Sequence, residues 1–504
     1  MSIKSWYLKY INKKKNKRIE AFTQRPLQVQ EKLCKDIFSY FKGTLFEKEF
    51  RLDKIKSLED LKRFPVTDAT ILKPFIDEIK KNNRPGIITR DKIKYIAQTG
   101  GSTGAHKYIP YPKKLIKSFQ NFQLKTAAHS CEYINDFNIL DKGLLVNPAT
   151  LVTEENDGVT IGMATGIMTK LAPSFSRKGV YPSIDILKIS DTNEKISRIK
   201  EEVLHKDIHG FSSPPSFAIP ILEAMLGDKE RITDIWKNFK IYIWSGSPLR
   251  NYRQRIKEII GDIPTFEVYS ATESAVAFQY KEEGKLLVDL DMSVFLFQEV
   301  GSSLDSPKLT ITELEKGKRY RILFTTYAGL INYNVGDAIE LLEHNPPIIR
   351  ILGREKEDVT IGGAERIKLE DIHKIIDLVA KEESLQVSNF FLSAYENESQ
   401  KKGYRWYFEF SHNEVDANRF LDKLEATLAS KALNYSYMRK GSARLLPPKI
   451  EIGKQGSLDR FLSERKVFAQ GKILQIYNDI DAAAPIWDFL ETNDLINQKA
   501  SASQ

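Results

Sequence analysis

The sequence has 504 residues, 41% of them hydrophobic and 11% aromatic, so the chain can bury a large core and divide into two or more domains. Its net charge of +9 comes from Lys and Arg residues that are spread along the chain among plentiful Asp and Glu, which argues against a nucleic-acid partner. No stretch approaches the roughly 20 apolar residues that cross a bilayer, so we do not expect an integral membrane protein. Two cysteines and no pattern of a secretory signal favour a cytoplasmic protein, which we expect to be a monomer.

The N-terminal segment, residues 1–25, is predicted to be a basic extension. Five Lys and Arg residues lie between positions 13 and 18, after the aromatic-rich stretch "WYLKYIN" on a short predicted helix. A solvated helix face is the usual interpretation of such a cluster, and contact with an acidic surface or a membrane is the alternative.

Alternating strand and helix patterns predict an α/β fold for the larger part of the chain. Strand-like runs at 95–99, 240–246, 265–270 and 319–326 are separated by helical stretches such as 250–260. After about residue 352 the order becomes helix, strand, strand, helix, which indicates a smaller α+β unit. The predicted domains are therefore 1–352 and 353–504, joined at the charged, turn-prone segment "IIRILGREKED".

The glycine-rich stretch "QTGGSTGAHKYIPY", from Gln98 to Tyr111, lies between a strand-like run and a helix-like segment. Loops in such a position can bind phosphates, because glycines let backbone N–H groups approach closely while hydroxyl groups and Lys107 add donors. The stretch matches neither the Walker pattern nor the dinucleotide-binding pattern. A purely structural turn is the alternative.

Two later segments add polar groups that suit a nucleotide. "VYSATESA" places Tyr269, Thr272 and Glu273 after a strand-like run, and "YNVGDAIEL" places Asp337 after a glycine. These residues offer an aromatic face for a base, a hydroxyl for a phosphate, a carboxylate for a hard cation and a carboxylate for ribose hydroxyls. Taken singly, each could also be a core aromatic or a solvated turn.

The order of these segments, followed by "GR" at Gly353 and Arg354, resembles that of adenylate-forming enzymes. Within that superfamily, "HKYIPYPKKLIKSF", "WSGSPLRNYRQRIKEIIG", "LLVDLDMSVFLFQEV", "TTYAGLINYNVGDAIEL" and "SLDRFLSERKVFAQGKI" resemble the Gretchen Hagen acyl acid amido synthetase family. The resemblance runs from about residue 60 to about residue 475. It implies a large adenylation domain of layered sheets and helices over 1–352 and a smaller, mobile C-terminal lid over 353–504.

The resemblance also implies a reaction. ATP and a carboxylic acid give an acyl-adenylate and pyrophosphate, and an amine, usually that of an amino acid, then gives an amide and AMP. ATP and Mg²⁺ are the implied cofactors, and small-molecule acids and amino acids are the implied partners, with a protein carboxy-terminus as acyl donor left open. A coenzyme A ligase of the phenylacetate type and a non-catalytic nucleotide-binding protein are the alternatives.

Carried over by position, the resemblance implies a role for each of several residues. The triphosphate would contact Thr99, Ser102, Thr103, Gly104 and Lys107, and the adenine would contact Tyr269, Ser245 and Gly246. Thr272 would contact the α-phosphate, and Glu273 would bind magnesium. Asp337 and Arg354 would contact the ribose. Lys472 would be a mobile catalytic cation, and Lys107 and Thr272 would also be catalytic residues. A surface lysine is equally compatible with the position of Lys472.

The sequence departs from the family pattern at two positions. Gly100 stands where a hydroxyl residue is usual, and Asn334 stands where an arginine is usual. The wall that contacts the acid is expected after the glycine-rich stretch, with Phe122 and Lys125 as candidates, although aromatics at helical spacing are more often core residues.

Overall fold

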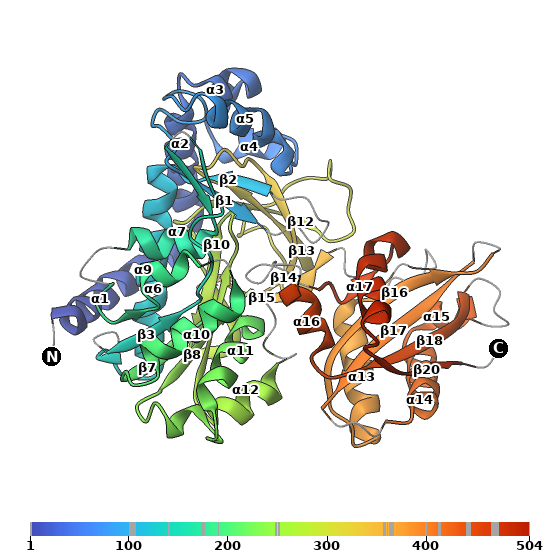
Figure 1. The fold of residues 1–504 in the computed structure, drawn as a ribbon. Helices are drawn as coiled ribbons and strands as arrows, with labels where there is room; N and C mark the ends of the chain where they lie inside the picture. The colour runs from blue at the N-terminus through green and yellow to red at the C-terminus, as the bar shows by residue number, and fades with distance from the viewer. Residues whose placement is uncertain are drawn as a thin grey trace. The chain divides into compact units, whose positions relative to one another are not determined.

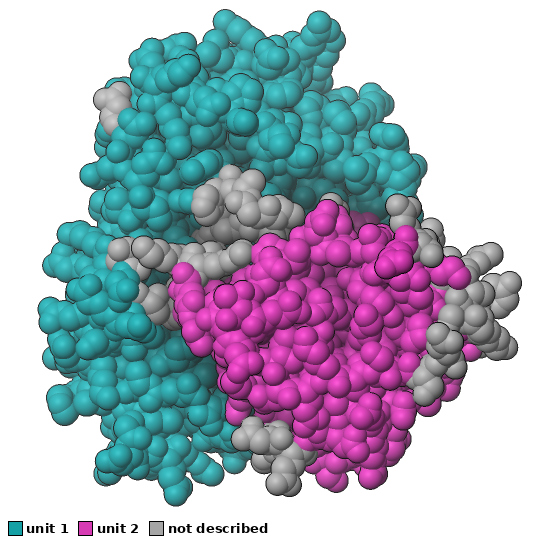
Figure 2. Space-filling view, turned by 45° about the vertical axis from the view of Figure 1, so that its right-hand side comes forward, with its two compact units in different colours: residues 1–101, 105–351 teal, residues 102–104, 352–504 magenta. Residues whose placement is uncertain are grey.

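The computed structural model describes residues 3–99, 107–139, 142–156, 158–172, 177–189, 191–246, 249, 252–355, 359, 361, 367–398, 401–411, 415–439, 445–464 and 473–502. The chain divides into two compact units, which Figure 2 distinguishes by colour. The first unit ends at Ile351 and the second begins at Leu352.

The helices of the first unit begin where the sequence supplies helix-starting residues. Pro26 and Pro74 lie in the first turn of α2 and of α5, where a missing N–H costs nothing, and Asp191 caps α10 by accepting a hydrogen bond from the Glu194 N–H. No described helix combines the length and the apolar character that crossing a membrane requires. The helices are α1 (Ile3–Gln24), α2 (Pro26–Phe41), α3 (Leu45–Phe50), α4 (Leu58–Arg63), α5 (Lys73–Lys81), α6 (Lys113–Tyr133), α7 (Ala164–Leu171), α9 (Ile184–Leu187), α10 (Thr192–Val203), α11 (Pro215–Leu226) and α12 (Arg253–Ile260).

A large mixed sheet forms the centre of the first unit (Figure 1). Over the described residues, its strand order is β12-β13-β14-β15-β11-β10-β9-β8-β7-β3-β6. The strands β3, β6, β7, β8 and β9 run parallel, and β10 is antiparallel to β9. The strands are β3 (Gly143–Val146), β6 (Val180–Tyr181), β7 (Ile208–Ser212), β8 (Ile241–Ser245), β9 (Thr265–Ser270), β10 (Ala275–Tyr280), β11 (Glu282–Val288), β12 (Val294–Glu299), β13 (Arg319–Thr325), β14 (Tyr333–Glu343) and β15 (Ile348–Arg354).

Apolar packing explains why the parallel strands read as nearly continuous hydrophobic runs. Parallel strands are covered on both faces, so inward and outward positions are both apolar. On one side, Phe211 of β7 and Tyr242 of β8 share a buried cluster with Leu222 of α11 and Ile256 of α12. The strands predicted at 240–246, 265–270 and 319–326 are confirmed as β8, β9 and β13, and the helix predicted at 250–260 is confirmed from Arg253 onward as α12.

A smaller sheet in the same unit has the order β2-β1-β5-β4, with β1 (Tyr95–Thr99), β2 (Lys107–Pro110), β4 (Glu154–Asn156) and β5 (Val159–Gly162). β1 and β2 are antiparallel, and Thr99 lies opposite Lys107. The predicted order of strand, loop and helix was therefore wrong, because a second strand separates the glycines from helix α6. The β-branched and aromatic residues of this short strand favour sheet pairing.

The second unit confirms the predicted order of helix, strand, strand, helix and continues it with further elements. Its sheet has the order β19-β16-β17-β18-β20 within the described residues. The elements are α13 (Leu369–Glu382), β16 (Val387–Glu396), β17 (Lys402–Phe410), α14 (Ala417–Lys431), α15 (Leu433–Arg439), β18 (Leu445–Gly453), α16 (Ser457–Glu464), β19 (Ile476–Tyr477), α17 (Ile480–Thr492) and β20 (Ile496–Ser501).

Both faces of this second sheet are covered. Successive side chains of β16 point to opposite sides, and they pack into two different clusters. Phe390 and Leu392 belong to the cluster that includes residues of α13 and α14. Phe391, between them, belongs to a separate cluster with Trp487 of α17 and Leu458 of α16.

A buried carboxylate on β17 holds the beginning of α16. Glu409 is fully buried and accepts hydrogen bonds from the backbone N–H groups of Gly456 and Leu458, at 2.9 and 2.8 Å. Burial raises the pKa of Glu409 from 4.5 to about 7, although these two hydrogen bonds oppose the shift.

We predict that Glu409 makes the stability of the protein depend on pH. Because its pKa is higher in the folded state, the folded state binds more protons between about pH 4.5 and about pH 7, and the free energy of unfolding falls as pH rises through this window. Relative to the Glu409→Gln variant, the wild type should lose roughly 1–3 kcal/mol between the two ends of the window. Denaturant titrations, with hydrogen exchange over residues 456–464, measure the effect.

Glu464→Gln is the matched control, since Glu464 is the last residue of α16, the helix whose beginning Glu409 holds, and pairs with Arg460 at the surface. Its pH profile should follow that of the wild type. Parallel profiles for the wild type and Glu409→Gln would show that Glu409 titrates normally.

Candidate active site

The turn between β9 and β10 is where the sheet changes from parallel to antiparallel pairing. It holds Thr272 and Glu273, and it is closed by a hydrogen bond from the Ala271 N–H to the Ser274 carbonyl. The Tyr111 hydroxyl, which follows β2, donates to the Thr272 carbonyl at 2.7 Å. Both contacts engage backbone groups of the turn and fix its conformation. Neither contact uses the Thr272 hydroxyl or the Glu273 carboxylate.

Asp337 is placed by a bulge in β14. Arg321 of β13 pairs with Ala338, whereas Leu323 pairs with Asn334, so three residues of β14 face one residue of β13. Such a bulge redirects a side chain out of the regular alternation. Gly336 takes a φ of +82° in the bulge, and its N–H donates to the Asn334 side-chain oxygen at 2.8 Å. Asn334, in the place of the usual arginine, thus shapes the segment that carries Asp337.

A hydrogen bond joins the two motifs that were far apart in the sequence. The Tyr269 hydroxyl on β9 donates to the Asp337 carboxylate at 2.7 Å. The predicted adenine contact and the predicted ribose contact therefore lie side by side.

A second set of contacts brings the glycine-rich stretch to the same strands. The Tyr333 hydroxyl at the start of β14 donates to the Glu273 carboxylate at 2.8 Å and accepts from the Lys107 ammonium at 3.2 Å. Glu273 is 7% exposed, and Tyr333 is 1% exposed. The charge of Glu273 also contributes, after burial, to a pKa of Tyr111 well above its usual value.

The other predicted site residues lie at or directly after the ends of strands, or outside the described residues. Ser245 ends β8, where it pairs with Val268 of β9, and Gly246 follows with a φ of +81°. Thr99 ends β1. Arg354 ends β15, beyond the end of the first unit. Gly100, Ser102, Thr103, Gly104 and Lys472 are outside the described residues.

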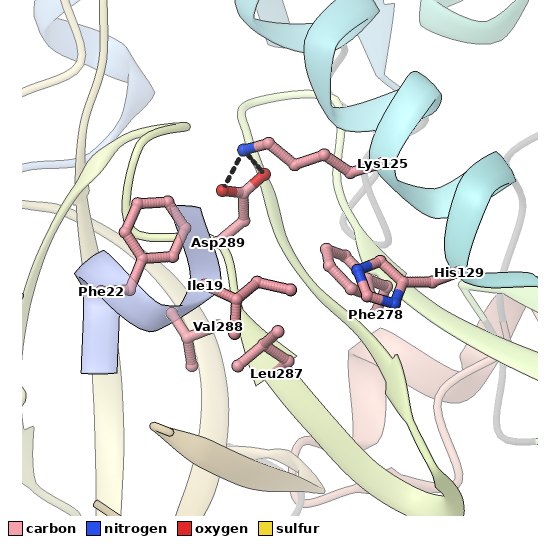
Figure 3. Close-up of a pocket in the computed structure, with 8 residues that line it drawn as sticks. All are labelled: Ile19, Phe22, Lys125, His129, Phe278, Leu287, Val288 and Asp289. Carbon is pink, nitrogen blue, oxygen red and sulfur yellow. Dashed lines mark hydrogen bonds and ion pairs between the residues drawn. The ribbon is translucent and has the colours of Figure 1, made fainter. Parts of the chain in front are cut away.

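Phe122 and Lys125 of α6 make other contacts, in the packing between α6 and the large sheet. Phe122 packs edge-on against Phe278 of β10, and the Lys125 ammonium pairs with the carboxylates of Asp289 and Asp291. Burial raises the pKa of Asp289 to about 7, which the charge of Lys125 opposes. Figure 3 shows the cavity beside this ion pair, and Ile19 and Phe22 of α1 close it from another side. An acid-binding role for the two α6 residues stays a prediction.

Sequence reasoning missed Tyr333 and Tyr111 at this site, and it also missed the buried Lys195 elsewhere in the first unit. Tyr333 begins the "YNVGD" segment, four residues before Asp337, and this position was the sequence signal that could have identified it. Lys195 is buried on α10 and donates to the Pro148 carbonyl and the Thr150 hydroxyl at 3.2 and 3.0 Å. Burial lowers its pKa to about 8. No sequence pattern marks such a lysine, because its burial depends on long-range packing.

The described residues contain no group of three or more His, Cys, Asp or Glu side chains that could hold a metal ion by themselves. A metal at this site would therefore need ligands from a substrate. The described contacts join the carboxylates of Glu273 and Asp337 to tyrosine hydroxyls and bring in a lysine from a neighbouring hairpin.

Comparisons with known proteins find relatives in sequence and solved structures with a similar fold. The indole-3-acetic acid-amido synthetase GH3.10 of Arabidopsis thaliana is 22% identical over 62% of this chain and 67% of its own length. Among solved structures, the acyl acid amido synthetase GH3.15 matches with a TM-score of 0.81 at 16% identity, over 98% of each chain. A 2-hydroxyisobutyryl-CoA ligase matches with a TM-score of 0.57 at 15% identity, over 94% of this chain and 92% of its own. These likenesses confirm the predicted α/β fold with a smaller second domain.

Family models match along most of the chain. The GH3 family N-terminal domain matches residues 15–199, the central domain residues 287–354 and the C-terminal domain residues 370–480. The central match includes Tyr333 and Asp337, and it ends at Arg354. The chain belongs to the GH3 family, as its resemblance to the Gretchen Hagen acyl acid amido synthetases implied.

Proposed function

We propose that this protein adenylates a carboxylic acid with ATP and transfers the acyl group to an amine, most readily that of an amino acid. The observation that supports this best is the pair of contacts between distant motifs, from Tyr269 to Asp337 and from Tyr333 to Glu273. They gather groups suited to a base, a ribose and a metal-bound phosphate on one set of strands.

The chemistry explains why such groups are needed. A carboxylate is a poor electrophile, because its leaving group would be oxide. In the first step a carboxylate oxygen attacks the α-phosphorus of ATP, and the bond from that phosphorus to the bridging oxygen breaks to release pyrophosphate. In the second step the amine nitrogen attacks the acyl carbon, AMP leaves, and the nitrogen loses its proton. Both anions of the first step must be brought together, so cationic groups and donors are required where charge builds up.

The residues of the site would divide this work. Asp337 would accept from the ribose hydroxyls, held in place by Tyr269, whose ring would lie against the base with Ser245 and Gly246 nearby. Thr272 would donate to the α-phosphate from a turn that Tyr111 fixes. Lys107 would bind the leaving phosphates, together with Thr99 and the glycine-rich residues that follow it.

Five further residues keep proposed roles from the resemblance alone. Ser102, Thr103 and Gly104 would contact the triphosphate through backbone N–H groups and hydroxyls. Arg354 would contact the ribose at the hinge, and Lys472 would supply a mobile cation to the reaction.

Magnesium fits the donor set. Mg²⁺ is usually held by one or two carboxylates together with substrate phosphates and water, and Glu273 offers one carboxylate in a turn that is otherwise fixed. Bound there, Mg²⁺ would neutralise phosphate charge. Lys107 and the turn would then keep the triphosphate aligned for attack.

The nature of the acceptor is the main alternative. The fold does not choose between amide and thioester formation, since a coenzyme A ligase also matches it. The curated relatives favour the amide, because those matched over most of the chain include an indole-3-acetic acid-amido synthetase and a jasmonoyl-L-amino acid synthetase. The acid itself stays open, and it can be a small molecule or a protein carboxy-terminus.

We predict amine-dependent AMP release. The protein is incubated with ATP, Mg²⁺, a panel of carboxylic acids and either amino acids or coenzyme A, and AMP and the conjugates are followed by mass spectrometry. Amides should accumulate with at least one acid. A strict requirement for the thiol would replace the proposal by the coenzyme A ligase, and no nucleotide turnover with any acid would favour a non-catalytic nucleotide-binding protein.

We also predict that Lys107→Ala slows adenylation more than it weakens binding of the acid. Removing one group that stabilises developing charge should lower the rate of acid-dependent exchange between ATP and pyrophosphate roughly 100-fold, with the KM for the acid changed by a factor of about two or less.

The matched control is Lys113→Ala, since Lys113 forms a surface ion pair with Asp91 at the start of α6. This variant should exchange at the wild-type rate. A rise in the KM for the acid without a loss of rate in Lys107→Ala would place the lysine at the acid and not at the phosphates.

A further inference from the structure

The Tyr333 hydroxyl lies between two side chains of opposite charge. It accepts a hydrogen bond from the Lys107 ammonium at 3.2 Å and donates one to the Glu273 carboxylate at 2.8 Å. Both charged residues belong to the described part of the chain, and no ion pair joins them directly. The three groups come from β2, from the start of β14 and from the turn after β9.

We infer that Tyr333 is a positioning residue whose hydroxyl keeps Lys107 and Glu273 apart, so that the ammonium stays available to phosphate and the carboxylate to a divalent cation. This inference rests on the proposed function and deepens it. It concerns how the site avoids neutralising its own charges before the substrate arrives.

The hydrogen bonds to the Tyr333 hydroxyl use only part of the hydrogen-bonding capacity of Lys107 and Glu273. A phenol has one donor hydrogen and two acceptor lone pairs, an ammonium has three donors, and a carboxylate has two oxygens. One donor of Lys107 and one oxygen of Glu273 are used by Tyr333. The remaining donors of the lysine and the second carboxylate oxygen are not used by this contact.

The electrostatics explain why a spacer is needed. Glu273 is buried, so its attraction to a nearby ammonium is stronger than between two exposed groups, although the exposure of Lys107 reduces it. Without the hydroxyl, the lysine could move into direct contact with the carboxylate. A direct pair would lower the positive charge offered to phosphate and the negative charge offered to a cation.

The tyrosine is held firmly enough to act as a spacer. It pairs with Phe324 across β13 and β14, forms a bridge with Thr67, and its ring lies 6.4 Å from that of Phe324. Asp68, next to Thr67, also feels the charge of Lys107, which helps to lower its pKa after the larger effect of its hydrogen bond with Thr70. The lysine therefore has a second acidic neighbour in Asp68.

The test is Tyr333→Phe, which removes the hydroxyl and keeps the ring. The matched control is Tyr320→Phe, because Tyr320 is also fully buried on the adjacent strand β13, and its hydroxyl accepts a hydrogen bond from the Glu315 N–H at 2.8 Å. Calorimetry measures Mn²⁺ binding in the presence of a non-hydrolysable ATP analogue, with the folded fraction of every variant taken from thermal unfolding.

Tyr333→Phe should bind Mn²⁺ about tenfold more weakly, as is typical when a residue that orients a metal ligand is lost, and Tyr320→Phe should bind it like the wild type. The Mg²⁺ concentration for half-maximal ATP–pyrophosphate exchange should rise in parallel, with the KM for the acid unchanged. In addition, Lys107→Met should improve Mn²⁺ binding more in the Tyr333→Phe background than in the wild type, because no ammonium is left to pair with Glu273.

The outcomes separate this inference from the proposed function. Equal Mn²⁺ affinity in Tyr333→Phe and the wild type, or additive effects of the two substitutions, would overturn the spacer role even if the wild type is fully active. A wild type that binds Mn²⁺ with the nucleotide analogue but shows no exchange with any acid would overturn the proposed function, and the calorimetry would still decide the role of Tyr333. A wild type that does not bind Mn²⁺ together with the nucleotide analogue would overturn both the spacer role of Tyr333 and the proposed function.

Discussion

The site depends on one change of direction in the large sheet. Strands β3, β6, β7, β8 and β9 run parallel, and β10 then turns back against β9. The short turn between them puts Thr272 and Glu273 at the carboxyl end of the last parallel strand, where open sheets of this kind commonly bind ligands. The Tyr111, Tyr333 and Asp337 side chains contact this turn or the strand before it, and Lys107 is linked to the turn through Tyr333.

Two other segments, β14 and the β1–β2 hairpin, are linked by different physical means to the turn and to the strand before it. The bulge in β14 redirects Asp337 toward Tyr269, and the start of the same strand brings the Tyr333 hydroxyl to Glu273. The β1–β2 hairpin supplies Lys107, and the residue after β2 holds the turn through its hydroxyl. Each charged group thus rests on a strand or a tight turn, which is the support that a site for a polyanionic substrate needs in order to keep like charges in fixed places.

Sequence patterns predicted the fold class, the strands around the site and the motifs that meet there. They succeeded because the apolar runs at 241–245 and 265–270 are strongly strand-like and because the motifs occur in a recognisable order. They did not reveal the second strand after the glycines, since four residues are too few to show a period. They also could not predict the pairing of Lys125 with Asp289 and Asp291, because residues so distant along the chain meet only through tertiary packing. Tyr333 was within a quoted motif, but only its neighbours in space show that its hydroxyl joins two opposite charges.

The central claim is that the acid is activated as an adenylate, and isotope transfer tests it most directly. The protein is given ATP, Mg²⁺, an amino acid and a substrate acid labelled with ¹⁸O in both carboxylate oxygens, and the products are weighed by mass spectrometry. An adenylate intermediate predicts that each turnover moves one ¹⁸O atom into AMP and leaves pyrophosphate unlabelled. Label in inorganic phosphate with ADP as the nucleotide product, or amide formation with unlabelled AMP, would contradict it.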